Sequence, residues 1–364
     1  MFHIIRPSLK LALAALLALD ATVACACTGI TIRPADGSVV FSRTMEFGAD
    51  LKSNVIIIPR GHQFHGTAPG DKPGMRWKTK YGIVGTNAFD EPLIADGLNE
   101  KGLHIGVFYF PGYAQYQPVG PEEADRALAP WELGTYLLGA CSNVDEAVEA
   151  ANQVLVGEVV MEKMGIVPPL HLIATDASGK SVVFEHVAGK LTIHPNPLGV
   201  MTNSPQFDWH MTNLSNYVTM TPKNFEGIDL AGNKITPLGQ GSGMLGLPGD
   251  FTPPSRFVRA VAFSQTALPV ETAEQGVLQA FHILNQFDIP KGAAMGIEHG
   301  VEVADYTLWT SAVDLKNLRH YFRTFENSQI RMVDLKQVDF DAPTIKTISM
   351  RGEEIIADLS QTAK

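Results

Sequence analysis

The first alternating pattern of apolar and polar positions along the chain predicts a β-hairpin. Residues 28–33 alternate β-branched side chains with others, and residues 39–43 form a second run that favours a strand. Between them stand Asp36 and Gly37, a pair typical of the tight turn that joins two antiparallel strands. We therefore expect the second strand to return beside the start of the first.

Later patterns predict more strands than helices. Strands are expected at residues 93–96, 103–110 (after a turn at 99–102), 171–175, 182–186 and 191–194. Helices are expected at residues 132–141, 145–154, 254–264 and 272–288, with Ser142 as a candidate cap of the second. Two Gly/Pro-rich segments, 61–74 and 225–249, are expected to be loops that rim a pocket. Because strand runs and helix runs fall in separate blocks, the pattern favours an α+β layered domain.

The first 26 residues have the pattern of a secretory signal peptide. Arg6 and Lys10 precede a run of Leu and Ala at 11–19, which is too short to span a bilayer as a helix. Ala24 and Ala26 occupy the small-residue positions of a cleavage site before Cys27. We expect residues 1–26 to be removed and residues 27–364 to form a single exported domain, which favours the periplasm.

An alternative interpretation of this segment is a lipoprotein signal. Residues 22–25 loosely resemble a lipobox that ends at Cys25, although Thr22 stands where leucine is usual. The two interpretations differ in chemistry, since an acylated Cys25 leaves Cys27 with an ordinary peptide nitrogen. No later stretch approaches the ~20 apolar residues that a transmembrane helix needs, so the sequence predicts no membrane span.

Composition excludes several kinds of partner. The 364 residues carry a formal net charge of −10 with no cluster of Lys or Arg, which argues against nucleic acid and anionic membranes. Three cysteines are too few for a disulfide framework. His62 and His65 have no third ligand nearby in the sequence, so no metal site is expected.

Cleavage after Ala26 would give Cys27 a free α-amine. An α-amine titrates near ~7.7–8.0 and a thiol near ~8.5, so a neutral amine and an activatable thiol coexist close to neutral pH. In an N-terminal nucleophile the amine accepts the thiol proton and the sulfur attacks a carbonyl carbon. The alternative is a cysteine that merely flanks a cleavage site. The hairpin also returns Arg43 and Glu46 toward Cys27, where a cation favours the thiolate.

Short fragments spread along the chain carry a second signal. Cys-Thr-Gly at 27–29 and Ser-Arg-Thr-Met-Glu at 42–46 resemble the opening of the choloylglycine hydrolase and penicillin V acylase family. Further fragments similar to the family's follow in the same order, at residues 96–103, 110–112, 201–205, 209–214, 246–250, 255–259, 314–316 and 321–324. Their order behind a cleavage-exposed cysteine makes the resemblance specific.

The resemblance implies a fold and a set of site residues. It implies a four-layer αββα sandwich of the N-terminal-nucleophile type that hydrolyses linear amide C–N bonds without metal or cofactor. Carried over by position, Cys27 is the nucleophile, Arg43 lies beside the sulfur, and Asn203 contributes to the oxyanion hole. Arg256 matches a second site arginine that orders the polar network. Glu46 stands where the family usually has an aspartate that contacts the amine.

Tyr109 aligns with a position that varies between substrate classes. By the resemblance, bile salt hydrolases commonly have asparagine there, whereas penicillin V acylases have tyrosine. An aromatic ring suits an apolar or aromatic acyl group, and the backbone N–H of Tyr109 is a candidate second oxyanion donor. Phe47 and Tyr113 lie near these positions and are candidates to line an acyl pocket, with packing in the core or at the surface as the favoured alternative for both. We therefore expect an amidase of the penicillin V acylase type, with bile salts and N-acyl homoserine lactones as further candidate substrates.

Two other expectations concern partners and function. The resemblance implies a small-molecule N-acyl amide as substrate and a homotetramer as the assembly. A different class of function also stays open, that of a periplasmic binding or envelope protein that keeps the fold without the chemistry. Glu46 in place of the usual aspartate is the one sequence hint for it.

Overall fold

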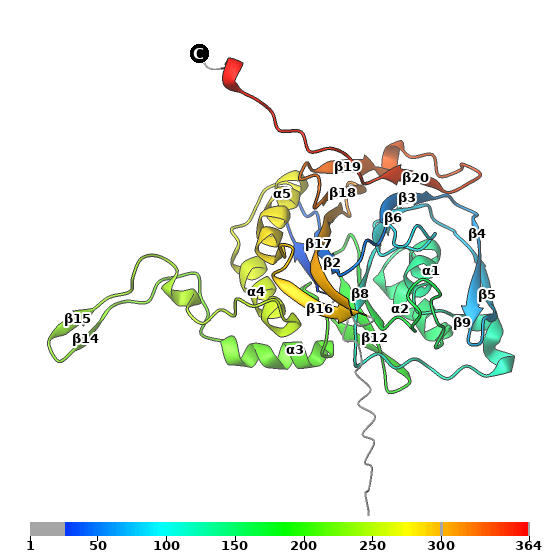
Figure 1. Cartoon of the computed structure of the whole chain (residues 1–364), viewed down its shortest axis with the longest axis horizontal. Helices are drawn as coiled ribbons and strands as arrows, with labels where there is room; N and C mark the ends of the chain where they lie inside the picture. Colours follow the sequence, from blue (N-terminus) through cyan, green and yellow to red (C-terminus); the bar gives the residue numbers. More distant parts are fainter. Residues whose placement is uncertain (1–25, 299–300, 363–364) are drawn as a thin grey trace, which may run out of the picture.

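Two β-sheets form the centre of the protein (Figure 1). The computed structural model describes residues 26–298 and 301–362, so the predicted signal peptide, Ala26 excepted, lies outside the described residues. The first sheet has the order β1-β2-β17-β18-β19, with β16 paired to β17. Its strands are β1 (Cys27–Ile32), β2 (Val40–Phe47), β16 (Ala294–Glu298), β17 (Val301–Asp314), β18 (Arg319–Thr324) and β19 (Arg331–Asp334).

The second sheet has the order β13-β12-β11-β8-β7-β6-β3-β20. Its strands are β3 (Asn54–Ile58), β6 (Ile83–Thr86), β7 (Asp96–Asn99), β8 (His104–Tyr109), β11 (Leu170–Thr175), β12 (Ser181–Val187), β13 (Lys190–Pro195) and β20 (Lys346–Ser349). Three small two-stranded pairs lie outside the two sheets: β4 (Gln63–Ala68) with β5 (Lys72–Lys78), β9 (Ala127–Leu128) with β10 (Leu155–Val156), and β14 (Ile228–Leu230) with β15 (Asn233–Ile235).

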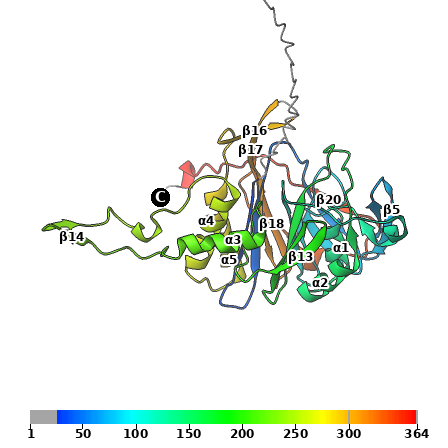
Figure 2. The same cartoon turned by 90° about the horizontal axis from the view of Figure 1, so that it is seen from below.

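Helices cover the outer face of each sheet. On the first sheet, α4 (Pro253–Thr266) and α5 (Ala273–Leu284) pack against β1, β2 and β17. On the second, α1 (Leu133–Ala140) and α2 (Val144–Gln153) pack against β7, β8 and β11. The order helix, sheet, sheet, helix confirms the predicted αββα sandwich (Figures 1 and 2). Across the described residues, no helix has the length and apolar character needed to span a bilayer.

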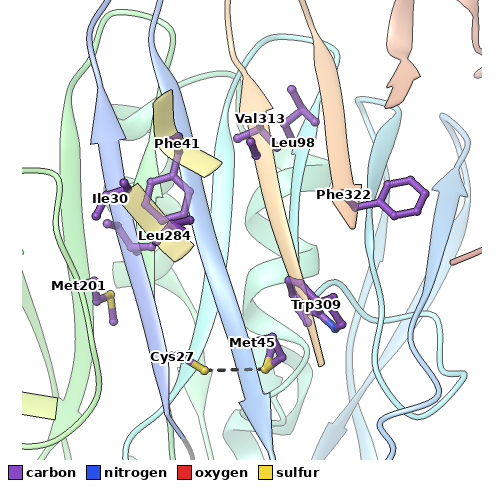
Figure 3. Close-up of a cluster of buried hydrophobic side chains, with 14 of the residues drawn as sticks. Cys27, Ile30, Phe41, Met45, Leu98, Met201, Leu284, Trp309, Val313 and Phe322 are labelled. Atoms are coloured by element: carbon purple, nitrogen blue, oxygen red, sulfur yellow. Dashed lines mark hydrogen bonds between the residues drawn. The ribbon is translucent and has the colours of Figure 1, made fainter. Parts of the chain in front are cut away.

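β1 and β2 are buried at every position because one face meets helices and the other meets the second sheet. Ile30 and Phe41 pack in this interior with Leu98 of β7 and Phe322 of β18 (Figure 3). The same strands carry polar side chains, among them Arg43 and Glu46, that are equally buried. Buried polar groups need partners, so these residues point to a site within the sandwich.

A close approach of two glycines joins β6 to β7. Gly85 pairs with Gly97 in the register, and a Cβ added to Gly97 would lie 2.6 Å from the Gly85 Cα and the Val84 carbonyl oxygen. Gly97→Ala is therefore expected to destabilise the fold by about 1–3 kcal/mol through overpacking. Thermal melting checks this, with Gly249→Ala as control because its added Cβ meets no atom within 4 Å. Equal melting temperatures for the two variants would contradict the argument.

Most predicted elements are confirmed near their expected places. The first hairpin pairs β1 with β2, and Gly37 takes a positive φ of 75° in its turn. The strand before the turn at 99–102 is β7 (Asp96–Asn99) rather than 93–96, because pairing with β6 begins at Asp96. The four predicted helices are present, but α5 ends at Leu284 and continues as the 3₁₀ turn η4 (Asn285–Phe287).

Three details of the sequence predictions are wrong. Asn143, not Ser142, caps α2, because its side chain directly precedes the helix and accepts from the Glu146 N–H at 2.9 Å. Residues 61–74 are mostly the β4–β5 hairpin rather than a loop. The segment 225–249 includes the β14–β15 hairpin and extends away from the body (Figures 1 and 2).

Candidate active site

Cys27 lies at the start of β1, directly opposite Met45 of β2. Its thiol donates to the Met45 Sδ at 3.8 Å, the contact marked in Figure 3. Its backbone nitrogen donates to the Asn203 Oδ1 at 2.8 Å. Cys27 and Cys141 are both buried, and neither forms a disulfide within the described residues. The geometry thus fixes both the sulfur and the nitrogen of Cys27.

Arg43 lies on the same face of β2 as Met45, two positions away. Its Nη2 is 3.8 Å from the Met45 Sδ, so the Met45 sulfur contacts both Arg43 and the Cys27 thiol. The Arg43 Nη1 crosses to the second sheet and donates to the Val107 carbonyl at 2.5 Å, with the guanidinium carbon 4.0 Å from the Phe108 ring centroid. A buried cation therefore stands one side chain away from the thiol.

Asp96 supplies a buried negative charge near Arg43. Its carboxylate lies 3.0 Å from the His104 Nε2 and accepts from the Ser311 Oγ at 2.7 Å. Burial raises the pKa of this carboxyl, but His104 and the nearby Arg43 outweigh that effect and hold the pKa below its ordinary value. His104 is fully buried and stacks on Phe41, with 4.1 Å between the ring centroids.

Glu46 projects to the other face of β2, as the alternation along the strand requires. Its Oε1 accepts from the Thr307 Oγ1 at 2.9 Å, and its backbone N–H donates to the Ala26 carbonyl at 2.9 Å. Burial raises the pKa of the Glu46 carboxyl well above its ordinary value, the Cys27 sulfur raises it further, and Arg256 opposes both. Glu46 is therefore placed beside the peptide bond between Ala26 and Cys27.

Asn203 and Arg256 close the site from the side of the helices. The Asn203 Oδ1 accepts from the Arg256 Nη2 at 2.6 Å, and the Asn203 Nδ2 donates to the Tyr109 carbonyl at 2.8 Å. Arg256, from the first turn of α4, also donates to the Thr28 Oγ1 at 2.9 Å and to the Cys27 carbonyl. One amide side chain thus links the nitrogen of Cys27 to both β8 and α4.

An apolar pocket of about 600 Å³, counting its open mouth, adjoins the Cys27 thiol. Phe47 and Tyr109 both line it, with ring centroids 6.3 Å apart in an edge-to-face contact. The other lining side chains are nearly all aliphatic, aromatic or methionine. Tyr113 does not line this pocket; it is 38% exposed and stacks on Phe110 instead. Residues 61–74 and 225–249, the two segments expected to rim a pocket, do not line this one, but Phe64 and His65 of the first segment line a neighbouring cavity.

The described residues contain no group of three His, Cys, Asp or Glu arranged to hold a metal ion. The polar groups around Cys27 instead bond to one another and to backbone carbonyls. This arrangement orders a thiol, a nitrogen and two arginines at one end of an apolar pocket, which suits attack on the carbonyl of an apolar acyl group.

A second polar network holds the segment that carries Asn203. His171 lies 3.2 Å from the Glu185 Oε1 and 3.1 Å from the Thr202 carbonyl oxygen, and the same Oε1 accepts from the Phe207 N–H at 3.0 Å. Burial lowers the pKa of His210 to about 4, and its Nε2 lies 2.9 Å from the Asn203 carbonyl oxygen. Glu185 was not predicted as a site residue, since its only signal in the sequence is a charged residue inside the apolar strand at 182–186.

Glu185→Gln is expected to destabilise the fold by about 1.5–3 kcal/mol, because it weakens charge-assisted hydrogen bonds. Burial raises the pKa of Glu185, but hydrogen bonds from His171 and His194 lower it from 4.5 to about 2. The contribution of ionised Glu185 to the free energy of unfolding is therefore complete above pH 4.5 and is lost as the pH falls toward 2. The hydrogen bond to Glu185 raises the pKa of His194 above 6.5. The contribution of protonated His194 to the free energy of unfolding is therefore complete below pH 6.5 and is lost at higher pH.

The difference in melting temperature between wild type and Glu185→Gln should thus be widest between pH 4.5 and 6.5 and narrow on either side. Glu274→Gln is the matched control, because Glu274 is a 70% exposed partner of Arg319. A difference that does not vary with pH would show that the charge of Glu185 plays no part.

The layered architecture, with a cysteine at the start of the first strand, defines the fold class of the protein. This fold is the αββα sandwich of the N-terminal-nucleophile hydrolases. The chain belongs to the choloylglycine hydrolase family of linear amide C–N hydrolases, whose sequence model matches residues 27–348. The family resemblance inferred from the short sequence fragments is therefore confirmed, and the protein is a hydrolase of linear amide C–N bonds.

Individual relatives agree with this assignment. The bile salt hydrolase/transferase of Clostridium perfringens is 33% identical over 323 residues, which cover 88% of this chain and 96% of that protein. Penicillin V acylase of Pectobacterium atrosepticum is 30% identical over 321 residues, covering 83% of this chain and 78% of that protein. A crystal structure of a conjugated bile acid hydrolase variant from Clostridium perfringens matches with a TM-score of 0.80 and 32% identity, over 92% of this chain and 100% of that chain. Penicillin V acylase from Agrobacterium tumefaciens shares the fold, with a TM-score of 0.71 and 24% identity over 88% of this chain and 90% of that chain.

Proposed function

We propose that the mature protein begins at Cys27 and hydrolyses N-acyl amides with an apolar acyl group, with Cys27 as nucleophile. The observation that carries this proposal is the position of Cys27, whose thiol opens onto an apolar pocket while its nitrogen is held by Asn203. Removal of residues 1–26 turns that nitrogen into an α-amine that accepts the thiol proton near neutral pH.

The proposed reaction has two stages. The Cys27 sulfur attacks the carbonyl carbon, and the oxyanion of the tetrahedral intermediate accepts from the Asn203 Nδ2 and the Tyr109 N–H. The C–N bond then breaks, the leaving amine takes the proton held by the α-amine, and the acyl group stays on sulfur as a thioester. A water molecule next attacks the thioester carbonyl carbon and gives a proton to the α-amine. The C–S bond then breaks, the Cys27 sulfur takes this proton from the α-amine, and the carboxylic acid leaves.

Three charged or polar neighbours support these steps. Arg43 places a positive charge one side chain away from the sulfur, which favours the thiolate. Glu46 lies beside the Cys27 nitrogen, where its carboxyl group orients the α-amine of the processed chain. Arg256 holds the Cys27 carbonyl and the Asn203 side chain in register.

Penicillin V type amides stand first among the substrates, ahead of bile salt conjugates and N-acyl homoserine lactones. Tyr109 and Phe47 present two aromatic faces to the acyl group, and the pocket offers few partners for the hydroxyl groups of a steroid. The test is turnover of a panel of phenoxyacetyl amides, tauro- and glyco-conjugated bile acids, and acyl lactones. Fastest turnover of phenoxyacetyl amides is expected, and dominant turnover of bile conjugates would overturn this order.

Export and assembly complete the proposal. The family match begins at Cys27, which supports cleavage after Ala26 and a secreted, periplasmic enzyme.

The β14–β15 hairpin extends from the body with Ile228 and Leu230 more than half exposed, and it suits contact with a second copy in a homotetramer (Figure 2). Light scattering on the mature protein is expected to give the mass of four subunits, and a monomer mass would refute the assembly.

A further inference from the structure

A second chamber lies beside the apolar pocket of Cys27. It has a volume of about 880 Å³, counting its open mouth. Three residues, Leu93, Trp131 and Met161, line both cavities, and we call them the partition. Because the three residues come from separate segments of the chain, only the tertiary fold brings them together between the two cavities.

The two cavities differ in chemistry, and we call the pocket of Cys27 the inner pocket and the second chamber the outer chamber. The inner pocket is lined almost wholly by apolar side chains, with Cys27 in its wall. The outer chamber carries Glu91, Glu132, Thr135 and Lys163 around its walls, together with aromatic rings. A chain that passes the partition therefore leaves an apolar environment and enters one with hydrogen-bond donors and acceptors.

A half-exposed ion pair ties the two sides of the partition together. The Lys163 Nζ lies 2.6 Å from the Glu91 Oε1 and donates to the Phe89 carbonyl at 2.6 Å. Lys163 belongs to the segment that carries Met161, and Glu91 to the segment that carries Leu93. Exposed ion pairs contribute little to stability, so this tie can open for a ligand at small cost.

We propose that the acyl site has two compartments and accepts long linear acyl chains with a polar far end. The carbons next to the amide fill the inner pocket, the chain passes the partition, and the polar end lies in the outer chamber. This proposal rests on the proposed function, because it places the reacting carbonyl at Cys27. Met161 is then a residue that determines chain specificity.

The mature wild-type protein tests this proposal with four fluorogenic amides that share one leaving amine. Two carry butanoyl and dodecanoyl groups, and two carry the same chains with a terminal hydroxyl. The hydroxyl is expected to lower kcat/KM of the short substrate about tenfold or more, because it is buried without a partner in the inner pocket. The long substrate is expected to lose less than about threefold, since its hydroxyl reaches the outer chamber.

A variant tests the partition itself. Met161→Trp narrows the passage and is expected to lower kcat/KM for the two dodecanoyl amides about tenfold or more beyond any loss for the butanoyl amide, so the ratio of long to short turnover falls. Met295→Trp is the matched control, because Met295 is 53% exposed on β16 and lines neither cavity. Circular dichroism is the check that both variants fold.

The outcomes separate this inference from the proposed function. Equal hydroxyl penalties on short and long chains, or a Met161→Trp protein with an unchanged ratio of long to short turnover, would overturn the two-compartment site alone. If the mature protein hydrolyses neither these amides nor phenoxyacetyl amides, the proposed function fails as well.

Discussion

Replacing Cys27 with alanine is expected to lower kcat for amide hydrolysis by about 10⁴-fold or more. The variant removes the one thiol among the residues that line the apolar pocket, whose other lining side chains are aliphatic, aromatic or thioether groups. The measurement is turnover of a phenoxyacetyl amide by the mature variant and the mature wild type. Since Cys27 adjoins the expected cleavage position, intact mass must first show that both proteins begin at residue 27.

Cys141→Ala is the matched control for this variant. Burial raises the pKa of the Cys141 thiol to about 12, so this side chain stays protonated and inert at neutral pH. The control is expected to keep wild-type turnover, and iodoacetamide should label only Cys27 in the mature wild-type protein. Turnover within about tenfold of wild type after loss of Cys27 would refute its assigned role. A wild-type protein that binds the amide without any turnover would instead support a non-catalytic binding protein.

The second large effect is expected from Asn203→Asp, with kcat lower by about 10²–10³-fold. Asp has the shape of Asn and keeps an oxygen for the Cys27 nitrogen and for Arg256, whose contacts measure 2.8 and 2.6 Å. It replaces the donating Nδ2 with an acceptor, and an acceptor cannot stabilise an oxyanion. We therefore expect turnover to fall, and the melting temperature to fall less than in Asn203→Ala, because both variants take the donor from the Tyr109 carbonyl but only Asn203→Asp keeps the acceptor of Arg256.

This variant separates a catalytic from a structural contribution of Asn203. Asn203→Ala is the comparison, because it also removes the acceptor of the buried Arg256 and should lower the melting temperature. Turnover of Asn203→Asp within about threefold of wild type would remove Asn203 from the proposed oxyanion hole.

Local features of the fold were predictable where the chain itself brings residues together. The turn at Asp36 and Gly37 fixes the β1–β2 register, and that register alone sets Met45 opposite Cys27. The alternation along β2 then places Arg43 and Glu46 on opposite faces. Short elements were harder: α3 (Phe207–Asn213) was not predicted, because seven residues are too few to show a helical period.

Contacts between distant segments were not predictable from patterns of this kind. Glu185 and His171 support Asn203 only because β11, β12 and the segment before α3 meet in space. Trp131 and Met161 meet at the partition by the same kind of tertiary packing. Nearness in the sequence can also mislead. Tyr113 was a candidate for the pocket because it lies close to Tyr109 in the chain, but its ring packs on Phe110 instead.

The central claim is that processing converts the Cys27 nitrogen from an amide into the catalytic base. The most direct measurement is the N-terminal sequence and intact mass of the active, exported protein. We expect Cys27 as the first residue, with an unmodified α-amine. Full amidase activity in a protein that begins at any other residue, or whose Cys27 nitrogen is blocked, would contradict it.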